Sequence, residues 1–168
     1  VKNIIIMCLI NSLAQQVAKE LCAEINYNYI DLTEILEEIQ INSKTELNIV
    51  AQNLEFAKMS SEQLKIISNA KQTVFVCNNF NLLSEKFLNS LKEVCTTIYI
   101  EVDKNEYLEY RWKNNLDKPS KFKVETSVFE FRQKAYISCV DECIKFNGNV
   151  KALSKKLIKK FYNFIVNY

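Results

Sequence analysis

Short apolar runs alternate with stretches of helical periodicity along this chain. The first run, residues 3–9, is too short to span a membrane and is bounded by polar residues, which is typical of a buried parallel strand. Apolar side chains then recur every four residues, as on one face of a helix, at Leu13, Val17, Leu21 and Ile25. Asn11 or Ser12 can cap this helix. The pattern therefore predicts that a strand, a tight turn and a helix open the chain.

The same pattern continues to the end of the chain. Further strands are predicted at residues 27–32, 73–77, 96–102 and 142–146. Helices are predicted at residues 33–40, in two pieces within 45–69, at 84–94, after Asp103 to about 112, at 124–138 and after the turn at 147–149. Polar stretches predict loops at 78–81 and at 113–123, and the second, a lid-like loop, holds the single proline. Strands alternating with helices indicate an α/β fold: one domain, 1–168, with three αβα layers and a central parallel sheet of about five strands.

Composition removes several classes of function. Apolar residues make up 48% of the chain and charged residues 25%, which is typical of a globular protein. The net charge of +2 is too small to argue for a nucleic-acid partner. The absence of histidine argues against a catalytic triad. No stretch reaches the ~20 apolar residues of a membrane span, and no signal peptide is visible, so we expect a cytoplasmic protein.

Six cysteines stand at positions 8, 22, 77, 95, 139 and 143, and none forms a CxxC pair. Cys8 and Cys77 lie in apolar runs that are typical of core strands. Cys139 and Cys143 are one helical turn apart if the preceding helix extends that far. We expect buried thiols in a reducing compartment. A zinc site is the alternative, and no metal ligands are predicted because the chain has no histidine.

Several collinear strings, together with the length and the order of elements, resemble the shikimate kinase family, small P-loop kinases of the nucleoside-monophosphate-kinase type. The strings are residues 3–6 (NIII), 18–21 (AKEL), 29–38 (YIDLTEILEE), 97–101 (TIYIE), 132–136 (RQKAY) and 140–141 (VD). The resemblance covers nearly the whole chain and implies a P-loop-kinase-like fold. It also implies an ATP site and a site for the phosphate acceptor.

The family's P-loop, GxxxxGK[ST], falls on residues 8–15 of this chain. Its two glycines become Cys8 and Leu13, its lysine becomes Ala14, and its Mg²⁺-holding hydroxyl becomes Gln15. The glycines let backbone N–H groups surround the phosphates, and the lysine meets the β- and γ-phosphates. The single glycine of the chain is Gly148, so the sequence has no glycine-rich phosphate cradle. The Walker A motif is degenerate by this comparison.

Weaker nucleotide-site candidates remain. The N-terminus of the first helix, at Ser12, offers a few N–H groups and a partial positive charge, which makes a weak anion site. Arg111 matches the family's adenine-stacking arginine. The alternative for Arg111 is packing on Tyr107, one helical turn away. The only other arginine in the chain is Arg132, so both arginines fall on family positions.

The acceptor site is also only partly matched. Asp31 keeps the first carboxylate of the family's D-x-D pair, and Thr33 replaces the second. Arg132 matches the arginine that pairs with the substrate carboxylate, although pairing with a surface carboxylate is its alternative. Lys118, before Pro119, partly matches the lid arginine. The family's acceptor arginine and its G-G-G loop are lost, at Phe56-Ala57 and at Asn78-Asn79-Phe80.

These matches predict a degenerate member without ATP-dependent phosphotransfer, retained as a binding, interaction or structural module. No catalytic residue and no cofactor are predicted. The alternative is an active small-molecule kinase of the shikimate type with a remodelled site, which would use ATP and Mg²⁺ and take cations from lysines elsewhere. The first residue is Val, so we expect that the chain is trimmed or is one piece of a longer protein. A protein partner, unidentified, is left open, with residues 78–80 as its predicted contact; no nucleic acid and no membrane span are expected.

The C-terminal stretch is strongly basic. From Lys145 to Tyr168 there are six lysines and no acidic residue, with Lys151, Lys155 and Lys159 on one helical face. Basic amphipathic helices bind anionic lipid. The alternative, which we favour, is a last helix docked on the sheet with its lysines in solvent.

Overall fold

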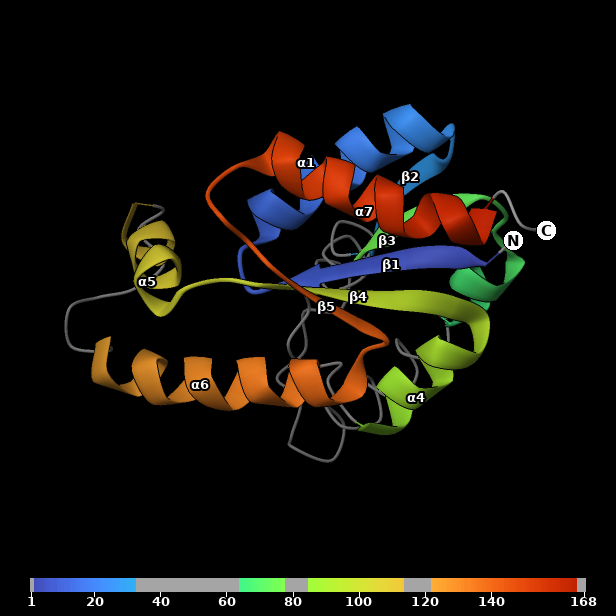
Figure 1. Ribbon diagram of the computed structural model, residues 1–168. Coiled ribbons are helices and arrows are strands. Elements are labelled where there is room, and N and C mark those ends of the chain that lie inside the picture. Colours follow the sequence, from blue (N-terminus) through green and yellow to red (C-terminus); the bar gives the residue numbers. More distant parts are fainter. Residues whose placement is uncertain (1, 33–63, 78–84, 114–121, 166–168) are drawn as a thin grey trace, which may run out of the picture.

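Five strands and the helices around them are described by the computed structural model, which covers residues 2–32, 64–77, 85–113 and 122–165 (Figure 1). The strands are β1 (Asn3–Cys8), β2 (Asn28–Asp31), β3 (Thr73–Val76), β4 (Cys95–Glu101) and β5 (Glu142–Lys145). The helices are α1 (Asn11–Ile25), α4 (Glu85–Val94), α5 (Lys104–Lys113), α6 (Phe122–Cys139) and α7 (Val150–Ile165). Residues 64–69 are also helical.

All strand pairs in the sheet are parallel, in the order β2-β3-β1-β4-β5. β1 lies at the centre, where Ile5 pairs with Phe75 of β3 on one side and with Thr97 of β4 on the other. Helices α1 and α7 cover one face of the sheet, and α4 and α6 cover the other (Figure 1). The predicted three-layer α/β fold with a parallel sheet of five strands is confirmed.

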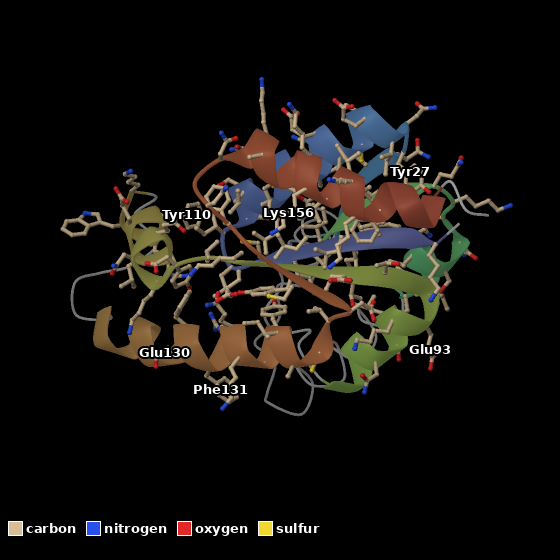
Figure 2. All side chains as sticks on the ribbon, in the orientation of Figure 1. Tyr27, Glu93, Tyr110, Glu130, Phe131 and Lys156 are labelled. Atoms are coloured by element: carbon tan, nitrogen blue, oxygen red, sulfur yellow. The ribbon has the colours of Figure 1, made fainter. Side chains whose placement is uncertain are left out.

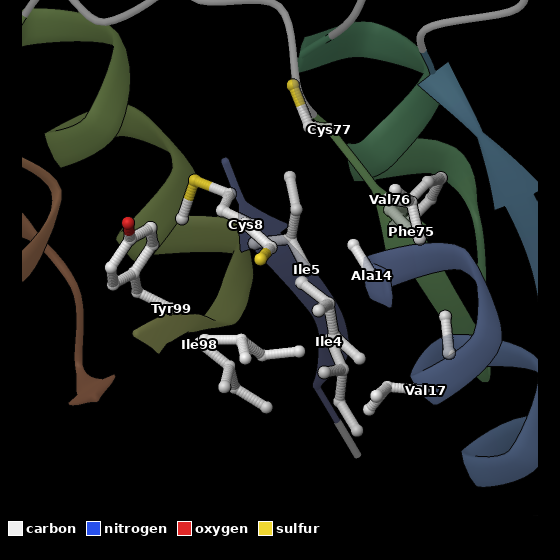
Figure 3. Packing of buried hydrophobic residues seen from close by; sticks show 14 of the residues in the cluster. Ile4, Ile5, Cys8, Ala14, Val17, Phe75, Val76, Cys77, Ile98 and Tyr99 are labelled. Atoms are coloured by element: carbon white, nitrogen blue, oxygen red, sulfur yellow. The ribbon is translucent and has the colours of Figure 1, made fainter. Parts of the chain in front are cut away.

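The core lies on both faces of β1, whose six residues are all buried. A strand with helices on both faces has no solvent side, which is why its sequence is apolar at nearly every position. Ile4, Ile5 and Cys8 of β1 pack among Phe75 and Val76 of β3, Ala14 and Val17 of α1, and Ile98 and Tyr99 of β4 (Figure 3). The position of β1 in the middle of a parallel sheet that is covered on both faces therefore explains its apolar sequence.

The predicted strands differ from the observed ones by one residue at an end at most. Helix α6 runs from 122 to 139 and is therefore longer than the predicted helix at 124–138. Helix α5 extends to Lys113, one residue beyond its predicted end. These two helices take both ends of the loop predicted at 113–123, and its residues 114–121 lie outside the described part of the chain. The predicted helix 33–40, most of 45–69 and the predicted loop 78–81 also lie outside it.

Two helix starts follow the capping rules. Asp103 caps α5 as predicted, because its Oδ1 accepts the N–H of Asn105 at 2.8 Å and Glu106 accepts the N–H of Asp103 in return. Asn149 Oδ1 accepts the N–H of Ala152 at 3.0 Å and caps α7. Gly148, before that cap, has φ +84°, a conformation that glycine adopts without strain. The turn predicted at residues 147–149 is thus confirmed.

The prediction of buried thiols holds for four of the six cysteines. Cys8, Cys22, Cys77 and Cys95 are buried, Cys139 is half-buried, and Cys143 is exposed. The prediction was wrong for Cys143, because β5 is the edge strand and this residue faces away from the core. No cysteine is in a disulfide.

Candidate functional site

The carboxyl edge of the sheet is where an α/β fold of this kind holds its ligands. β1 ends there at Cys8, β2 at Asp31 and β4 at Glu101. Helix α5 lies beyond the end of β4, at the same edge (Figure 1). Two of the predicted site residues lie close to these strand ends: Asp31 is the last residue of β2, and Ser12 lies in the first turn of α1, after β1. Arg111 lies in the last turn of α5.

The turn between β1 and α1 is very short. Only Leu9 and Ile10 separate the strand from the helix, and α1 begins at Asn11. In a strand–P-loop–helix unit the whole GxxxxGK[ST] segment precedes or opens the helix. Here Asn11 to Gln15 are already helical, so five of the eight residues aligned with the P-loop belong to α1.

The predicted cap of α1 was wrong. The N-cap residue is Ile10, without a side-chain capping bond, rather than Asn11 or Ser12. The Ile10 N–H instead donates to Cys8 Sγ at 3.4 Å, and the Ile10 carbonyl accepts the N–H of Ala14 at 3.2 Å. Burial raises the pKa of the Cys8 thiol to about 12, so the sulfur stays neutral. One amide of the turn is therefore used inside the protein.

Side chains of the turn are packed into the core. Leu13 is 5% exposed and Ala14 is fully buried, and Leu9 and Ile10 are also buried. Ser12 is half-buried in the first turn of α1. The position that the family resemblance gives to a phosphate-binding lysine thus holds a buried methyl group.

Asp31, at the end of β2, is 5% exposed and is held by donors from two elements. Gln15 Nε2 of α1 donates to Asp31 Oδ2 at 2.7 Å, and the Tyr29 hydroxyl donates to the same oxygen at 3.3 Å. The ammonium group of Lys19, one turn after Gln15, lies 5.3 Å from the centre of the Tyr29 ring. At the position that the resemblance gives to the family's Mg²⁺-holding hydroxyl, this chain thus places an amide group against the carboxylate of Asp31.

Arg111 lies half-buried on α5 and contacts Tyr107, as its alternative interpretation predicts. Its Nη1 donates to the Tyr107 hydroxyl at 3.3 Å, and its guanidinium carbon is 5.7 Å from the ring centre. Tyr107 in turn packs against Phe129 of α6, with ring centres 5.0 Å apart. An ion pair between Lys104 and Glu130, at 2.8 Å, also joins α5 to α6 (Figure 2). The adenine-stacking role of Arg111 stays a prediction.

Arg132 is half-buried on α6. Burial raises the pKa of Tyr136 well above its usual value, and the positive charge of Arg132 opposes that rise. The neighbouring Gln133 was not predicted as important. Its Oε1 accepts the Tyr99 hydroxyl at 3.0 Å and the Val102 N–H at 3.4 Å. No local pattern marks Gln133, because its partners lie on β4 and directly after it, more than 30 residues earlier in the sequence. Lys118 lies outside the described residues.

Among the described residues, no group of three or more histidine, cysteine, aspartate or glutamate side chains could hold a metal ion. No helix in the described part of the chain is both long and apolar enough to cross a bilayer.

Known proteins resemble this chain in both sequence and fold. A curated shikimate kinase from Alkaliphilus oremlandii is 27% identical over 103 residues, a stretch that spans 61% of this chain and 61% of that relative. A shikimate kinase from Acinetobacter baumannii, solved in complex with shikimate, has a TM-score of 0.77 at 12% identity, covering 97% of this chain and 94% of its own. The enzyme from Aquifex aeolicus has a TM-score of 0.72 at 20% identity, with 99% of both chains covered.

The model of one protein family, described as shikimate kinase, matches residues 15–163. The match begins at Gln15, the last of the residues on which the P-loop falls, and it includes the region of β2, α5 and α6. Because it spans most of the sequence, and the fold agrees with solved members, the chain belongs to the shikimate kinase family.

Proposed function

We propose that this chain is a degenerate shikimate kinase that does not transfer phosphate from ATP, and that its fold is retained as a binding, interaction or structural module. The observation that carries the proposal is the start of α1 at Asn11, only two residues after β1. Phosphate binding by a P-loop needs several backbone N–H groups that point into one space. A segment that is already helical directs most of its N–H groups along the helix axis instead.

Phosphoryl transfer depends almost entirely on positioning and on charge stabilisation. Three features argue against bound Mg²⁺–ATP at this turn. Ala14 supplies no positive charge, the Ile10 N–H is used by Cys8, and the Gln15 amide contacts the carboxylate of Asp31. The residues present therefore do not fit the nucleotide and its metal, and we derive no catalytic step from them.

An active small-molecule kinase with a remodelled site is the second candidate. It is supported by the family itself, whose curated and solved relatives carry the name shikimate kinase. Asp31 is retained at the carboxyl edge, and Arg111 and Arg132 stand on family positions. In this case ATP and Mg²⁺ would be the cofactors, Arg111 would stack on adenine, and Asp31, Arg132 and Lys118 would contact the acceptor.

Three coarser properties complete the proposal. A cytoplasmic location is supported by six cysteines without a disulfide, because such thiols persist in reducing compartments. A single domain over residues 1–168 is supported by the Aquifex aeolicus structure, which aligns with 99% of the chain. The lid-like function of residues 113–123 rests on the family resemblance alone, and so does an unidentified protein partner.

Ligand-dependent thermal stability tests the proposal. The protein is melted with ATP, ADP and shikimate, each at millimolar concentration and each with and without Mg²⁺, and calorimetric titration follows. A ligand at 100 times its Kd stabilises the native state by about 2.7 kcal/mol. For a chain of this size that raises Tm by about 5 to 11 °C. We expect no shift, in a protein that still melts cooperatively.

Two variants make the result specific. If Mg²⁺–ATP raises Tm, the rise should disappear in Arg111→Ala and persist in Lys134→Ala, which removes an exposed cation on α6. That outcome would overturn the proposal and favour the active kinase. The Aquifex aeolicus shikimate kinase serves as the positive control for the ligands and buffers.

A further inference from the structure

Helix α7 has two faces with sharply different side chains. Leu153, Leu157 and Phe161 are buried, and the helix packs beside α1 on one face of the sheet. The sequence-based preference for a docked last helix is thus confirmed. The exposed residues between 150 and 161 are Lys151, Ala152, Lys155, Lys156, Lys159 and Lys160. We call these five lysines the α7 lysine face; Lys156 is labelled in Figure 2.

Most of this positive charge has no ion-pair partner among the described residues. Within the described part of the chain, Lys160 is the member of the α7 lysine face that forms an ion pair, with Glu142 of β5. Glu20 and Glu24 are exposed on the neighbouring α1 and offset part of the charge. The other four lysines have no ion pair within the described residues, and they span a helix length of about 12 Å at 1.5 Å per residue.

We propose that the α7 lysine face binds the surface of a bilayer rich in anionic phospholipid. Clusters of four to eight basic residues on a helix attract anionic lipid headgroups, and the attraction adds up from one lysine to the next without shape complementarity. The helix does not insert, because the apolar side chains that would enter the bilayer are already buried against the protein. The contact is therefore purely electrostatic.

A protein partner fits this face less well. Protein interfaces are depleted in lysine and draw their affinity from buried aromatic, arginine or other anchor residues. Between residues 150 and 161, Ala152 is the only exposed side chain that is not a lysine, so this part of the helix offers no such anchor. Lysines also contact the phosphates of nucleic acids, so the experiment below compares a duplex directly with anionic vesicles.

The expected strength follows from the charge. Each lysine near an anionic surface contributes about a fivefold gain in partition, the equivalent of about 1 kcal/mol. With the two glutamates of α1 subtracted in part, the preference for anionic over neutral vesicles should be on the order of a hundredfold. It should fall steeply with salt, because exposed charges are screened beyond about 10 Å at 0.1 M ionic strength.

Vesicle sedimentation tests the proposal with the full chain. One set of vesicles contains phosphatidylcholine alone, and the other contains phosphatidylcholine with about one third phosphatidylserine. The test variant is Lys155→Gln/Lys156→Gln/Lys159→Gln. The control variant is Lys65→Gln/Lys71→Gln/Lys134→Gln, which removes the same charge from exposed positions outside α7. Thermal melting confirms that both variants fold, as exposed lysines should allow.

We expect the wild-type chain and the control variant to sediment with the anionic vesicles at low salt, and to be released at high salt. The test variant should bind no better than the wild-type chain binds neutral vesicles. Absence of wild-type binding overturns the proposal, and so does an equal loss in both variants, because binding would then follow net charge alone. Tighter binding to a DNA or RNA duplex, or to a polyglutamate peptide, than to anionic vesicles also overturns it.

Discussion

Replacing Gln15 by methionine tests whether the amide on Asp31 stabilises the fold. Methionine keeps the length of the side chain and a similar helix propensity, and removes the amide group, including the N–H that donates to Asp31. Asp31 is 5% exposed, and its bond to Gln15 Nε2 is 2.7 Å long. A hydrogen bond to a charged group contributes about 1.5–3 kcal/mol, and the longer bond from the Tyr29 hydroxyl to the same oxygen remains in the variant. We expect the free energy of unfolding to fall by about 2 kcal/mol.

Chemical denaturation followed by circular dichroism measures this loss, and a thermal melt should show a Tm lower by about 4 to 8 °C. Gln16→Met is the matched control, because Gln16 is the next residue of α1 and is exposed. The control should change stability by no more than about 0.5 kcal/mol. If Gln15→Met is as stable as Gln16→Met, the contact between Gln15 and Asp31 does not stabilise the native state, and the interpretation of the site as a protein-satisfied carboxylate fails.

Two further predictions concern the core. Asn3→Ala should lower the free energy of unfolding by about 3 kcal/mol or more in denaturation, because the buried side chain of Asn3 bonds to three backbone groups between residues 67 and 73; a loss below about 1 kcal/mol would contradict this. Burial raises the pKa of the Cys8 and Cys95 thiols from 9.0 to about 12, so their protons are held more tightly in the folded state. The stability they contribute is complete below pH 9 and is lost as pH rises toward 12, by up to about 1.4 kcal/mol per pH unit for each thiol. Denaturation at several pH values should show this decline, with a smaller slope in Cys95→Ala, and an unchanged slope would contradict the assignment.

Helix docking shows how far a local pattern can reach. The prediction of a last helix docked on the sheet is confirmed by Leu153, Leu157 and Phe161, which recur at helical spacing and are buried. The apolar run at residues 3–9 likewise predicted a buried parallel strand, and β1 is one. Both predictions succeed because a buried surface requires apolar side chains at the spacing of the element. In a helix they recur about every 3.6 residues, and in a parallel strand that is covered on both faces they occupy nearly every position.

The turn after β1 shows where local patterns fail. Asn11 and Ser12 are good capping residues, yet α1 starts one residue earlier, at a cap position held by Ile10. The burial of Ile10 and Leu13 in the core sets where the helix begins, and this outweighs a capping bond of about 1 kcal/mol. Capping rules consider only the residues near the start of a helix, so they cannot account for the packing of Ile10 and Leu13 in the core.

By itself the sequence determined the α/β class, the five strands within a residue at each end, the absence of any glycine-rich segment and the basic face of the last helix. These depend on periodicity and on residue type, which are local properties of the chain. Only the tertiary structure decided which polar groups meet. Asn3 bonds to Thr73 across 70 residues, Tyr99 bonds to Gln133 across 34, and Gln15 reaches Asp31 on another element. Such pairs form because parallel strands and their crossover helices bring together segments that are far apart in the sequence. The spacing of residues along the chain does not predict these contacts.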